Sequence, residues 1–304
     1  MQLSVVVPCF NEEESIVAFL KQLAEVLNAS FQTYEVIVVD DGSTDGTHEI
    51  LKHYPWPELK VVTFSRNFGH QAALTAGYKH SQGEFVATLD SDLQHPPELI
   101  PIMLSLALEK NVDVVYGVRP DRTDDGLFKR LSAQLYYRII RRLSGITIES
   151  SAADFRLMSK RSVDEALRFA NSGGVFRLLV PSLGFASISI PYKASVRFAG
   201  SSKYNFKKMV DLSTASVIAF STKPLTVAIR IGFIVSALSF FGFIYALVEF
   251  LVGRTLPGWA SLISVVLLLF GALFMVLGIL GAYVASIIRK IDERPIYRIR
   301  EEQE

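Results

Sequence analysis

The stretch FVATLDSDLQHPPELI, from Phe85 to Ile100, places two carboxylates where an apolar run stops. The run ends at Leu89, and Asp90 and Asp92 follow with one serine between them. Residues two apart in an extended chain share one side, so these acids would lie close together. Two such carboxylates repel each other unless one is protonated or a cation lies between them. The pair therefore predicts a site for Mg²⁺ or Mn²⁺, which bind one or two carboxylates together with substrate phosphates.

Strand and helix patterns alternate on both sides of this stretch. Apolar, β-branched runs predict buried strands, and apolar residues at helical spacing predict the helices between them. This alternation predicts an α/β fold with a mostly parallel sheet covered on both faces. The predicted strands are 3–8, 34–40, 59–65, 83–90 and 112–119, and the predicted helices lie within 11–28, 69–80 and 96–110.

Polar segments collect after the predicted strands, at 8–12, 40–45, 90–94 and 117–119. Ligands of parallel sheets bind beyond the carboxyl ends of the strands, so these segments predict one ligand site. The sequence lacks G-x-G-x-x-G after the first strand and lacks G-x-x-x-x-G-K-[ST], which disfavours dinucleotide oxidoreductases and P-loop NTPases. Without a glycine cradle, bound phosphates need another counter-charge, and a divalent cation supplies it. The strand-end position of the acid pair thus favours a metal site over the alternative, a solvated loop whose acids cap the next helix.

The C-terminal third of the chain holds two long uncharged runs, 231–248 and 259–288. A helix needs about 20 apolar residues to cross a bilayer, whereas a helix in a soluble core keeps a polar face. We therefore expect a transmembrane hairpin over 225–290, with helices at about 227–252 and 259–288. Basic residues flank the hairpin on both sides. They predict that the N-terminal domain and both termini are cytosolic. We expect a multi-pass protein of the inner (plasma) membrane. The second helix has small residues, namely Gly271, Gly278 and Ala282. They favour close helix packing, either within the hairpin or in a homo-oligomer.

Two further segments predict contact with a membrane surface. Residues 127–144 combine apolar residues at helical spacing with five Lys or Arg and no acid, which is the pattern of a basic amphipathic helix. An exposed helix on a soluble domain is the alternative for this segment. Residues 201–224 predict a second interfacial segment, and residues 291–304 a cytosolic tail. We expect a membrane, and no nucleic acid, as partner.

Nine segments follow one another along the chain, namely VVPCFNEEE, VVDDGSTDGT, SRNFGHQAAL, DSDLQHPPE, GVR, ADFRLMSK, VRFAGSSKY, FSTKPL and ERPIY. In this order they resemble glycosyltransferase family 2, whose GT-A fold is a Rossmann-like, mostly parallel α/β fold. More narrowly, the chain resembles the polyprenyl-phosphate glycosyltransferases, which include dolichyl-phosphate mannose synthase and the bacterial undecaprenyl-phosphate glucosyltransferases of O-antigen modification. The resemblance covers nearly the whole chain and implies a GT-A catalytic domain over 1–200.

The resemblance implies inverting, metal-dependent transfer of a single sugar from a nucleotide sugar to undecaprenyl phosphate. UDP-glucose is the donor that it favours, and the product would serve modification of a cell-envelope glycan such as lipopolysaccharide. A GDP-mannose or UDP-amino-arabinose donor, a sugar-1-phosphate transferase and an inactive membrane scaffold are the alternatives. The acceptor phosphate needs little help from a base, because its second pKa of about 6 leaves it anionic at neutral pH.

The resemblance also implies roles for individual residues. Asp92, Arg119 and Asp154 would be catalytic, with Asp154 acting as a base or orienting the metal or the acceptor. The nucleotide sugar would contact Pro8, Phe10, Glu12, Val39, Asp41, Asp90, Ser91, Asp92, Arg119, Arg197 and Lys203. The metal would bind Asp90, Asp92 and Gln94, and the acceptor phosphate would bind Lys129, Arg130 and Ser132. His70 and His95 have no metal-ligand spacing and are predicted to be non-catalytic.

Overall fold

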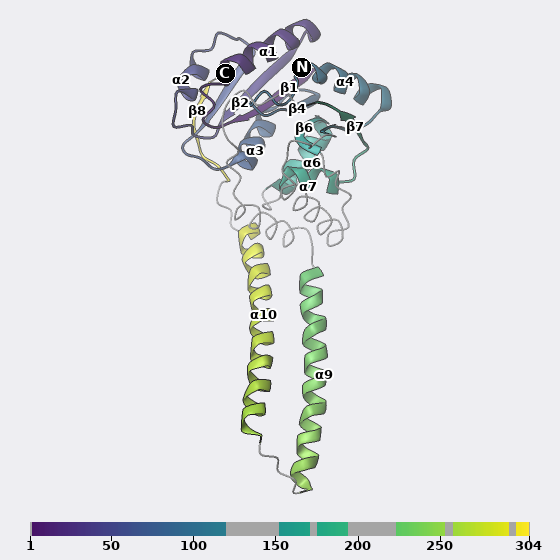
Figure 1. Ribbon diagram of the computed structural model, residues 1–304. Coiled ribbons are helices and arrows are strands. Elements are labelled where there is room, and N and C mark those ends of the chain that lie inside the picture. Colours follow the sequence, from purple (N-terminus) through teal and green to yellow (C-terminus); the bar gives the residue numbers. More distant parts are fainter. Residues whose placement is uncertain are drawn as a thin grey trace. The chain divides into compact units, whose positions relative to one another are not determined.

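The computed structural model describes residues 2–119, 152–170, 175–193, 223–252, 258–291 and 296–303. The chain divides into two compact units. The larger unit comprises Met1–Arg141, Gly145–Met209 and Glu293–Glu304, and the smaller comprises Arg142–Ser144 and Val210–Asp292. The larger unit therefore contains both ends of the chain (Figure 1).

The core of the larger unit is an eight-stranded sheet with the order β7-β5-β6-β4-β1-β2-β3-β8. Strand β1 pairs in parallel with β2 and β4, β2 pairs in parallel with β3, and β5 pairs in parallel with β7. Strand β6 is antiparallel to β4 and β5, and β8 is antiparallel to β3. The predicted mostly parallel sheet is confirmed. The strands are β1 (Leu3–Cys9), β2 (Tyr34–Asp40), β3 (Leu59–Phe64), β4 (Phe85–Thr88), β5 (Val114–Val118), β6 (Ala152–Ser159), β7 (Ser187–Pro191) and β8 (Ile299–Gln303).

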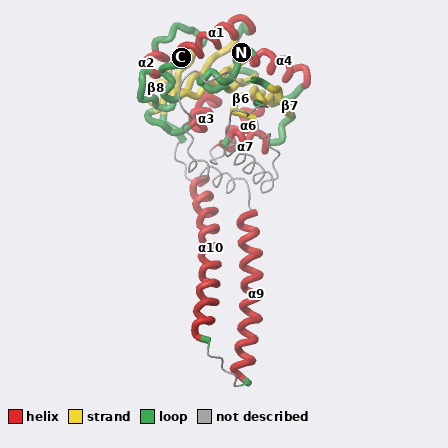
Figure 2. The backbone as a smooth tube through the Cα atoms, in the orientation of Figure 1, coloured by secondary structure: helices red, strands yellow, loops and turns green. Residues whose placement is uncertain are grey.

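Helices cover both faces of this sheet, as the sequence predicts (Figure 2). On one face, buried side chains of α1 and α4 pack in one cluster with Leu3, Val5 and Val7 of β1. On the other face, α3 contacts β1 and β2, while α6 and α7 contact β6. The helices are α1 (Ile16–Ser30), α2 (Thr47–Lys52), α3 (His70–His80), α4 (Leu99–Lys110), α6 (Lys160–Ala170) and α7 (Phe176–Ser182).

Helix α3 packs against β1 at a glycine. A Cβ atom added to Gly77 would lie 2.2 Å from Val6 Cγ1, which is far inside van der Waals contact. We expect Gly77→Ala to destabilise the fold by about 1–3 kcal/mol, because the extra carbon overpacks this helix-to-strand contact. Thermal melting of the purified full chain checks this, with Glu25→Ala on the exposed side of α1 as a control expected within about 0.5 kcal/mol of the parent. An unchanged melting temperature for Gly77→Ala would contradict the packing described.

The smaller unit contains two long helices that contact each other, α9 (Lys223–Leu251) and α10 (Trp259–Ile291). They coincide in position with the two predicted spans. Among the described residues, one helix is long and apolar enough to cross a membrane. This helix is α9, with the segment Leu225–Gly242, whereas α10 contains a shorter apolar segment, Leu269–Ala285. The predicted amphipathic helix at 127–144 lies outside the described residues, as does 201–222 of the second predicted interfacial segment.

Residues 299–303 fall within the predicted C-terminal tail, yet they form β8 at the edge of the sheet. The described part of the larger unit therefore extends beyond the predicted domain of residues 1–200.

Candidate active site

A cavity of ≈ 300 Å³ opens at the carboxyl ends of β1, β2 and β3. Its walls come from Phe10 after β1, from residues at and after the end of β2, and from residues at and after the end of β3, such as Phe64 and Arg66. Arg300 of β8 completes the lining. The volume lies at the lower end of the range for small-molecule sites, and most of the lining residues have polar side chains.

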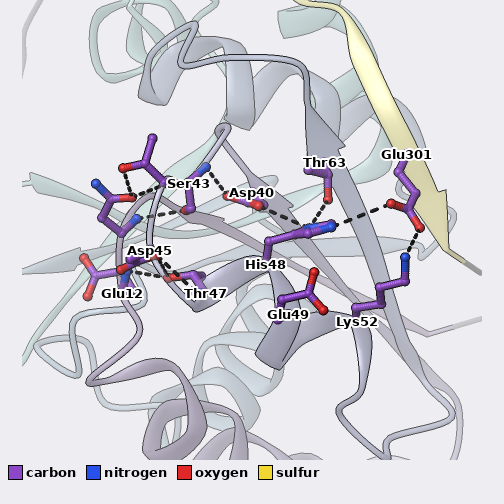
Figure 3. Close-up of polar contacts among 12 residues, drawn as sticks. Glu12, Asp40, Ser43, Asp45, Thr47, His48, Glu49, Lys52, Thr63 and Glu301 are labelled. Atoms are coloured by element: carbon purple, nitrogen blue, oxygen red, sulfur yellow. Dashed lines mark hydrogen bonds and ion pairs between the residues drawn. The ribbon is translucent and has the colours of Figure 1, made fainter.

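Asp40 is the acid that lines this cavity. It ends β2 and is fully buried. Its Oδ1 accepts a hydrogen bond from Ser43 N at 2.9 Å, whereas its Oδ2 has no hydrogen-bond partner among the described residues. His48 Nδ1 lies 3.6 Å from Oδ2 (Figure 3). A buried carboxylate oxygen without a donor is costly, so the cavity is suited to a ligand that presents an N–H or O–H group to it.

Asp41, the neighbouring acid that was predicted to contact the nucleotide sugar, faces the backbone of the loop between β3 and α3. Its carboxylate accepts hydrogen bonds from Phe68 N at 2.7 Å and Gly69 N at 2.8 Å. Burial raises the pKa of Asp41, and these two hydrogen bonds oppose that rise. Gly69 has φ 99°, a conformation that favours glycine, so Asp41 fixes the loop between β3 and α3 in a shape that depends on this glycine.

The other predicted nucleoside residues have varied surroundings. Phe10 lines the cavity. Val39 is fully buried in β2, where it pairs with Pro8 of β1. Pro8 O accepts a hydrogen bond from Ser91 Oγ at 3.4 Å, which ties the end of β1 to the end of β4. Glu12 Oε2 accepts a hydrogen bond from the hydroxyl of Ser15 at 2.6 Å, at the start of α1. Of these predicted nucleoside residues, Phe10 thus lines the cavity, whereas Pro8, Glu12 and Val39 do not.

The acid turn, Asp90–Gln94, follows β4. Asp90 Oδ1 lies 3.1 Å from His70 Nε2, and Asp90 N donates to His95 Nδ1 at 3.0 Å. Desolvation works to raise the pKa of Asp90, but the hydrogen bond from His70 and the charge of His95 lower it well below its usual value. His95 is buried and stacks on Phe155, with ring centroids 5.2 Å apart. Both histidines were predicted to be non-catalytic. The contact of His70 with Asp90 was not predicted because it is made between distant parts of the chain, and the hydrogen bond from Asp90 N to His95 depends on how the turn itself folds.

Asp92 stands at the centre of the same turn. Its Oδ1 accepts a hydrogen bond from Gln94 N at 3.1 Å, and the residue between them, Leu93, has φ 61°. No group of three or more His, Cys, Asp or Glu is placed to hold a metal within the part of the chain that the structure describes. Two carboxylates from one turn nevertheless fit Mg²⁺ or Mn²⁺, which commonly take the rest of their ligands from substrate phosphates and water.

The carboxylate of Asp154, in β6, forms ion pairs with two arginines. Its Oδ1 lies 3.1 Å from Arg156 Nη2, and its Oδ2 lies 3.2 Å from Arg177 Nη2 of α7. Burial would raise the pKa of Asp154, but the charges of Arg177 and Arg156 lower it. Arg156 is itself buried and donates to Phe176 O at 3.2 Å. The carboxylate is therefore held ionised and in a fixed orientation.

Arg119 directly follows β5, at the end of the strand. Its neighbour Val118 accepts a backbone hydrogen bond from Tyr192 N at 2.9 Å. Burial raises the pKa of Tyr192 to about 12, and the charge of Arg119 opposes that rise. Arg197, Lys203, Lys129, Arg130 and Ser132 lie outside the described residues.

The loop from Ser65 to His70 joins the cavity to the acid turn. Arg66 and Asn67 line the cavity, the next two residues bind Asp41, and His70 contacts Asp90. In the sheet order, β2 lies on one side of β1 and β4 lies on the other. Such a point, where consecutive connections go to opposite sides of a strand, is where open α/β sheets bind their ligands.

Comparison with known proteins matches residues 4–167 to the family model described as Glycosyl transferase family 2. This chain belongs to glycosyltransferase family 2. It is 37% identical over 303 residues to the uncharacterized glycosyltransferase YkcC of Bacillus subtilis (strain 168), covering 99% of this chain and 94% of that protein. It is 34% identical over 307 residues to the bactoprenol glucosyl transferase of Shigella phage SfV, covering 100% of both chains.

The fold of this glycosyltransferase is similar to solved structures. One is the glucosyl-3-phosphoglycerate synthase of Mycobacterium tuberculosis, crystallised with Mn²⁺, UDP and phosphoglyceric acid. The TM-score is 0.51 at 17% identity, covering 72% of this chain and 76% of that one. The predicted family and the prediction of an enzyme are confirmed: the chain is a glycosyltransferase with a GT-A-like fold.

Proposed function

We propose that this glycosyltransferase transfers a single sugar from a nucleotide sugar to a polyprenyl phosphate, with UDP-glucose and undecaprenyl phosphate as the pair. The observation that supports the donor is Asp40 Oδ2, a buried oxygen of a cavity-lining residue that has no hydrogen-bond partner among the described residues. The acceptor and the sugar are supported by the full-length relatives that are named bactoprenol glucosyl transferase. GDP-mannose and UDP-amino-arabinose are the alternative donors.

The nucleoside lies, in this proposal, in the cavity with its base toward Asp40. Uracil and guanine both carry a ring N–H that a buried carboxylate oxygen accepts, and Phe10 supplies an apolar wall. Asp41 holds the loop that carries Arg66 and Asn67 along the cavity. The other predicted residues, Pro8, Val39 and Glu12, support the backbone against which the nucleoside binds.

In this proposal the donor diphosphate lies over the acid turn, where Asp90 and Asp92, with Gln94, would hold a divalent cation. Such a cation, when bound, neutralises charge that develops on the leaving diphosphate. His70 fixes the orientation of the Asp90 carboxylate by its contact at 3.1 Å. Arg119 and Arg177 then surround the sugar-phosphate end with positive charge.

The chemistry is a single in-line displacement at the anomeric carbon, with inversion. An oxygen of the lipid phosphate attacks, the bond from the anomeric carbon to the diphosphate oxygen breaks, and the nucleoside diphosphate leaves. The phosphate nucleophile is already anionic near neutral pH. Asp154, with both oxygens in ion pairs and its pKa lowered, is therefore assigned to orienting Arg177 rather than to removing a proton.

The donor is tested by thermal shift of the purified full chain with UDP, GDP and their sugars in the presence of Mn²⁺. We expect UDP-glucose and UDP to stabilise the protein, because a ligand at 100 times its Kd contributes about 2.7 kcal/mol to the folded state. Stabilisation by GDP-mannose alone would replace the proposed donor, and no shift with any nucleotide would contradict a nucleotide site.

The acceptor lipid requires a membrane location, and we propose that α9 and α10 cross the inner membrane as a hairpin. Large apolar side chains of both helices, such as Phe233, Leu238 and Phe274, are exposed and suited to lipid. Basic residues at the start of α9 and near the end of α10 support a cytosolic location for both flanks. The larger unit, which includes β8, would then lie on the cytosolic side of the membrane.

This topology predicts labelling by a maleimide that does not cross membranes. Starting from Cys9→Ala, which removes the one buried native thiol, Thr255→Cys between the helices should react in intact cells. Gln303→Cys in β8 should react only after permeabilisation. The reverse pattern, or equal labelling of both, would contradict the proposed topology.

A further inference from the structure

The strand β8 lies next to β3 although most of the chain separates the two in sequence. Thr63 pairs with Glu301, Phe64 pairs with Ile299, and Ser65 N donates to Arg298 O at 3.0 Å. Ser65 is also part of the cavity wall. The backbone of the C-terminal segment therefore continues the edge of the sheet that forms the cavity.

Side chains fasten this segment to the sheet at several points. The ring of Tyr297 stacks on Phe64, with centroids 4.8 Å apart and planes inclined by 12°. Lys52 Nζ lies 2.8 Å from Glu301 Oε1, and His80 Nε2 lies 3.1 Å from Glu302 Oε1. Phe64 itself lines the cavity, so the stacked tyrosine supports the cavity wall directly.

An imidazole lies between the C-terminal strand and the buried acid of the cavity. His48 Nδ1 is 3.6 Å from Asp40 Oδ2, and His48 Nε2 is 3.6 Å from Glu301 Oε2 (Figure 3). The hydroxyl of Thr63 lies 3.3 Å from His48 Nδ1. Asp40 Oδ2 is thus linked, through the imidazole of His48, to Glu301 of β8.

Arg300 brings a positive charge to the same cavity. It is exposed, it lines the cavity, and its side chain makes no hydrogen bond or ion pair within the described ranges of the chain. A guanidinium group has five N–H donors and no acceptor, so it is suited to carbonyl oxygens. Asp40 accepts and Arg300 donates, which together match a nucleobase edge that carries an N–H group beside carbonyl oxygens.

The sheet order shows which end of a nucleotide Arg300 can reach. Strand β8 is four steps from β4 in the order β4-β1-β2-β3-β8, which is about 19 Å at ~4.8 Å for each step. The acid turn follows β4. A phosphate held at that turn is therefore beyond Arg300, and the base is the part of the nucleotide at the β8 side.

We propose that β8 forms part of the nucleotide-binding site and that Arg300 contacts the nucleobase. This inference rests on the proposed function, because it assumes that the cavity binds the donor nucleotide. It makes the last strand of the chain, which follows α10, a determinant of donor affinity.

Calorimetric titration of the purified full chain with UDP, and separately with uridine, tests the proposal. Arg300→Ala should raise the Kd of both probes by about ten-fold or more, because it removes a charged donor from the base. Arg298→Ala is the matched control: its side chain is an exposed arginine that lies outside the cavity lining, two residues earlier. It should leave both values unchanged.

Equal Kd values for Arg300→Ala, Arg298→Ala and the parent would overturn the inference and leave the proposed function standing. A loss of UDP affinity with unchanged uridine affinity would also overturn it, because the contact would then be to phosphate. If the parent chain binds neither UDP nor GDP, the proposed function itself fails. Thermal melting of each variant, expected to match the parent, ensures that a change in Kd reports on the cavity.

Discussion

Replacing Asp92 with alanine should lower kcat/KM for sugar transfer by about 10²–10³-fold. The replacement removes one of two carboxylates that hold the proposed cation, and with it the stabilisation of charge on the leaving diphosphate. Asp92 is placed for this role by the turn that it forms with Gln94, whose backbone N–H donates to Asp92 Oδ1. The measurement is radiolabelled sugar transferred to undecaprenyl phosphate by the purified full chain.

Two controls separate metal binding from damage to the fold. Asp164→Asn changes an exposed acid of α6 that pairs with Lys160, and it should retain full activity. A chelator should abolish transfer by the parent enzyme, and added Mn²⁺ or Mg²⁺ should restore it. Full activity of Asp92→Ala, or transfer that continues in the chelator, would contradict a metal at this turn.

Replacing Asp40 with asparagine should raise the Kd for the donor nucleotide by about 10- to 100-fold. The asparagine carbonyl can take the place of Oδ1 and keep the hydrogen bond from Ser43 N. Its amide NH₂ then stands where Oδ2 was, so that a donor faces the N–H of the base. A hydrogen bond to a charged group contributes about 1.5–3 kcal/mol, which corresponds to this loss of affinity.

Glu49→Gln is the control for this substitution, because Glu49 is an exposed acid of α2 close to the same network (Figure 3). It should bind the nucleotide as the parent does. Asp41→Asn tests the choice suggested by the sequence. If Asp41→Asn weakened binding while Asp40→Asn did not, and both variants melted as the parent does, the assignment of Asp40 to the base would be wrong.

The sequence predicts the framework of the larger unit well, because the strands and helices there are long and regularly patterned. The five predicted strands correspond to β1–β5, and α1 buries the apolar side chains that its spacing indicates. Two elements near the site escaped prediction. Strand β6 contains the buried Arg156, whose charge interrupts the apolar pattern, and β8, with the sequence IREEQ, has one apolar residue.

The sequence predicts which segments form the site, but not which of their side chains line it. The sequence locates the polar strand ends, but Asp40 and Asp41 are adjacent, and only the register of β2 decides which one enters the cavity. The contacts of His70 and His95 with Asp90 depend on how α3 and the acid turn pack. No local pattern marks Arg300, which reaches the cavity through the pairing of β8 with β3.

The most direct test of the central claim is to identify both products made from UDP-glucose and undecaprenyl phosphate by the purified full chain. The account predicts UDP in equal amount to undecaprenyl phosphate glucose, with the anomeric configuration opposite to that of the donor. Release of UMP with undecaprenyl diphosphate glucose, or retention of the donor configuration, would contradict it.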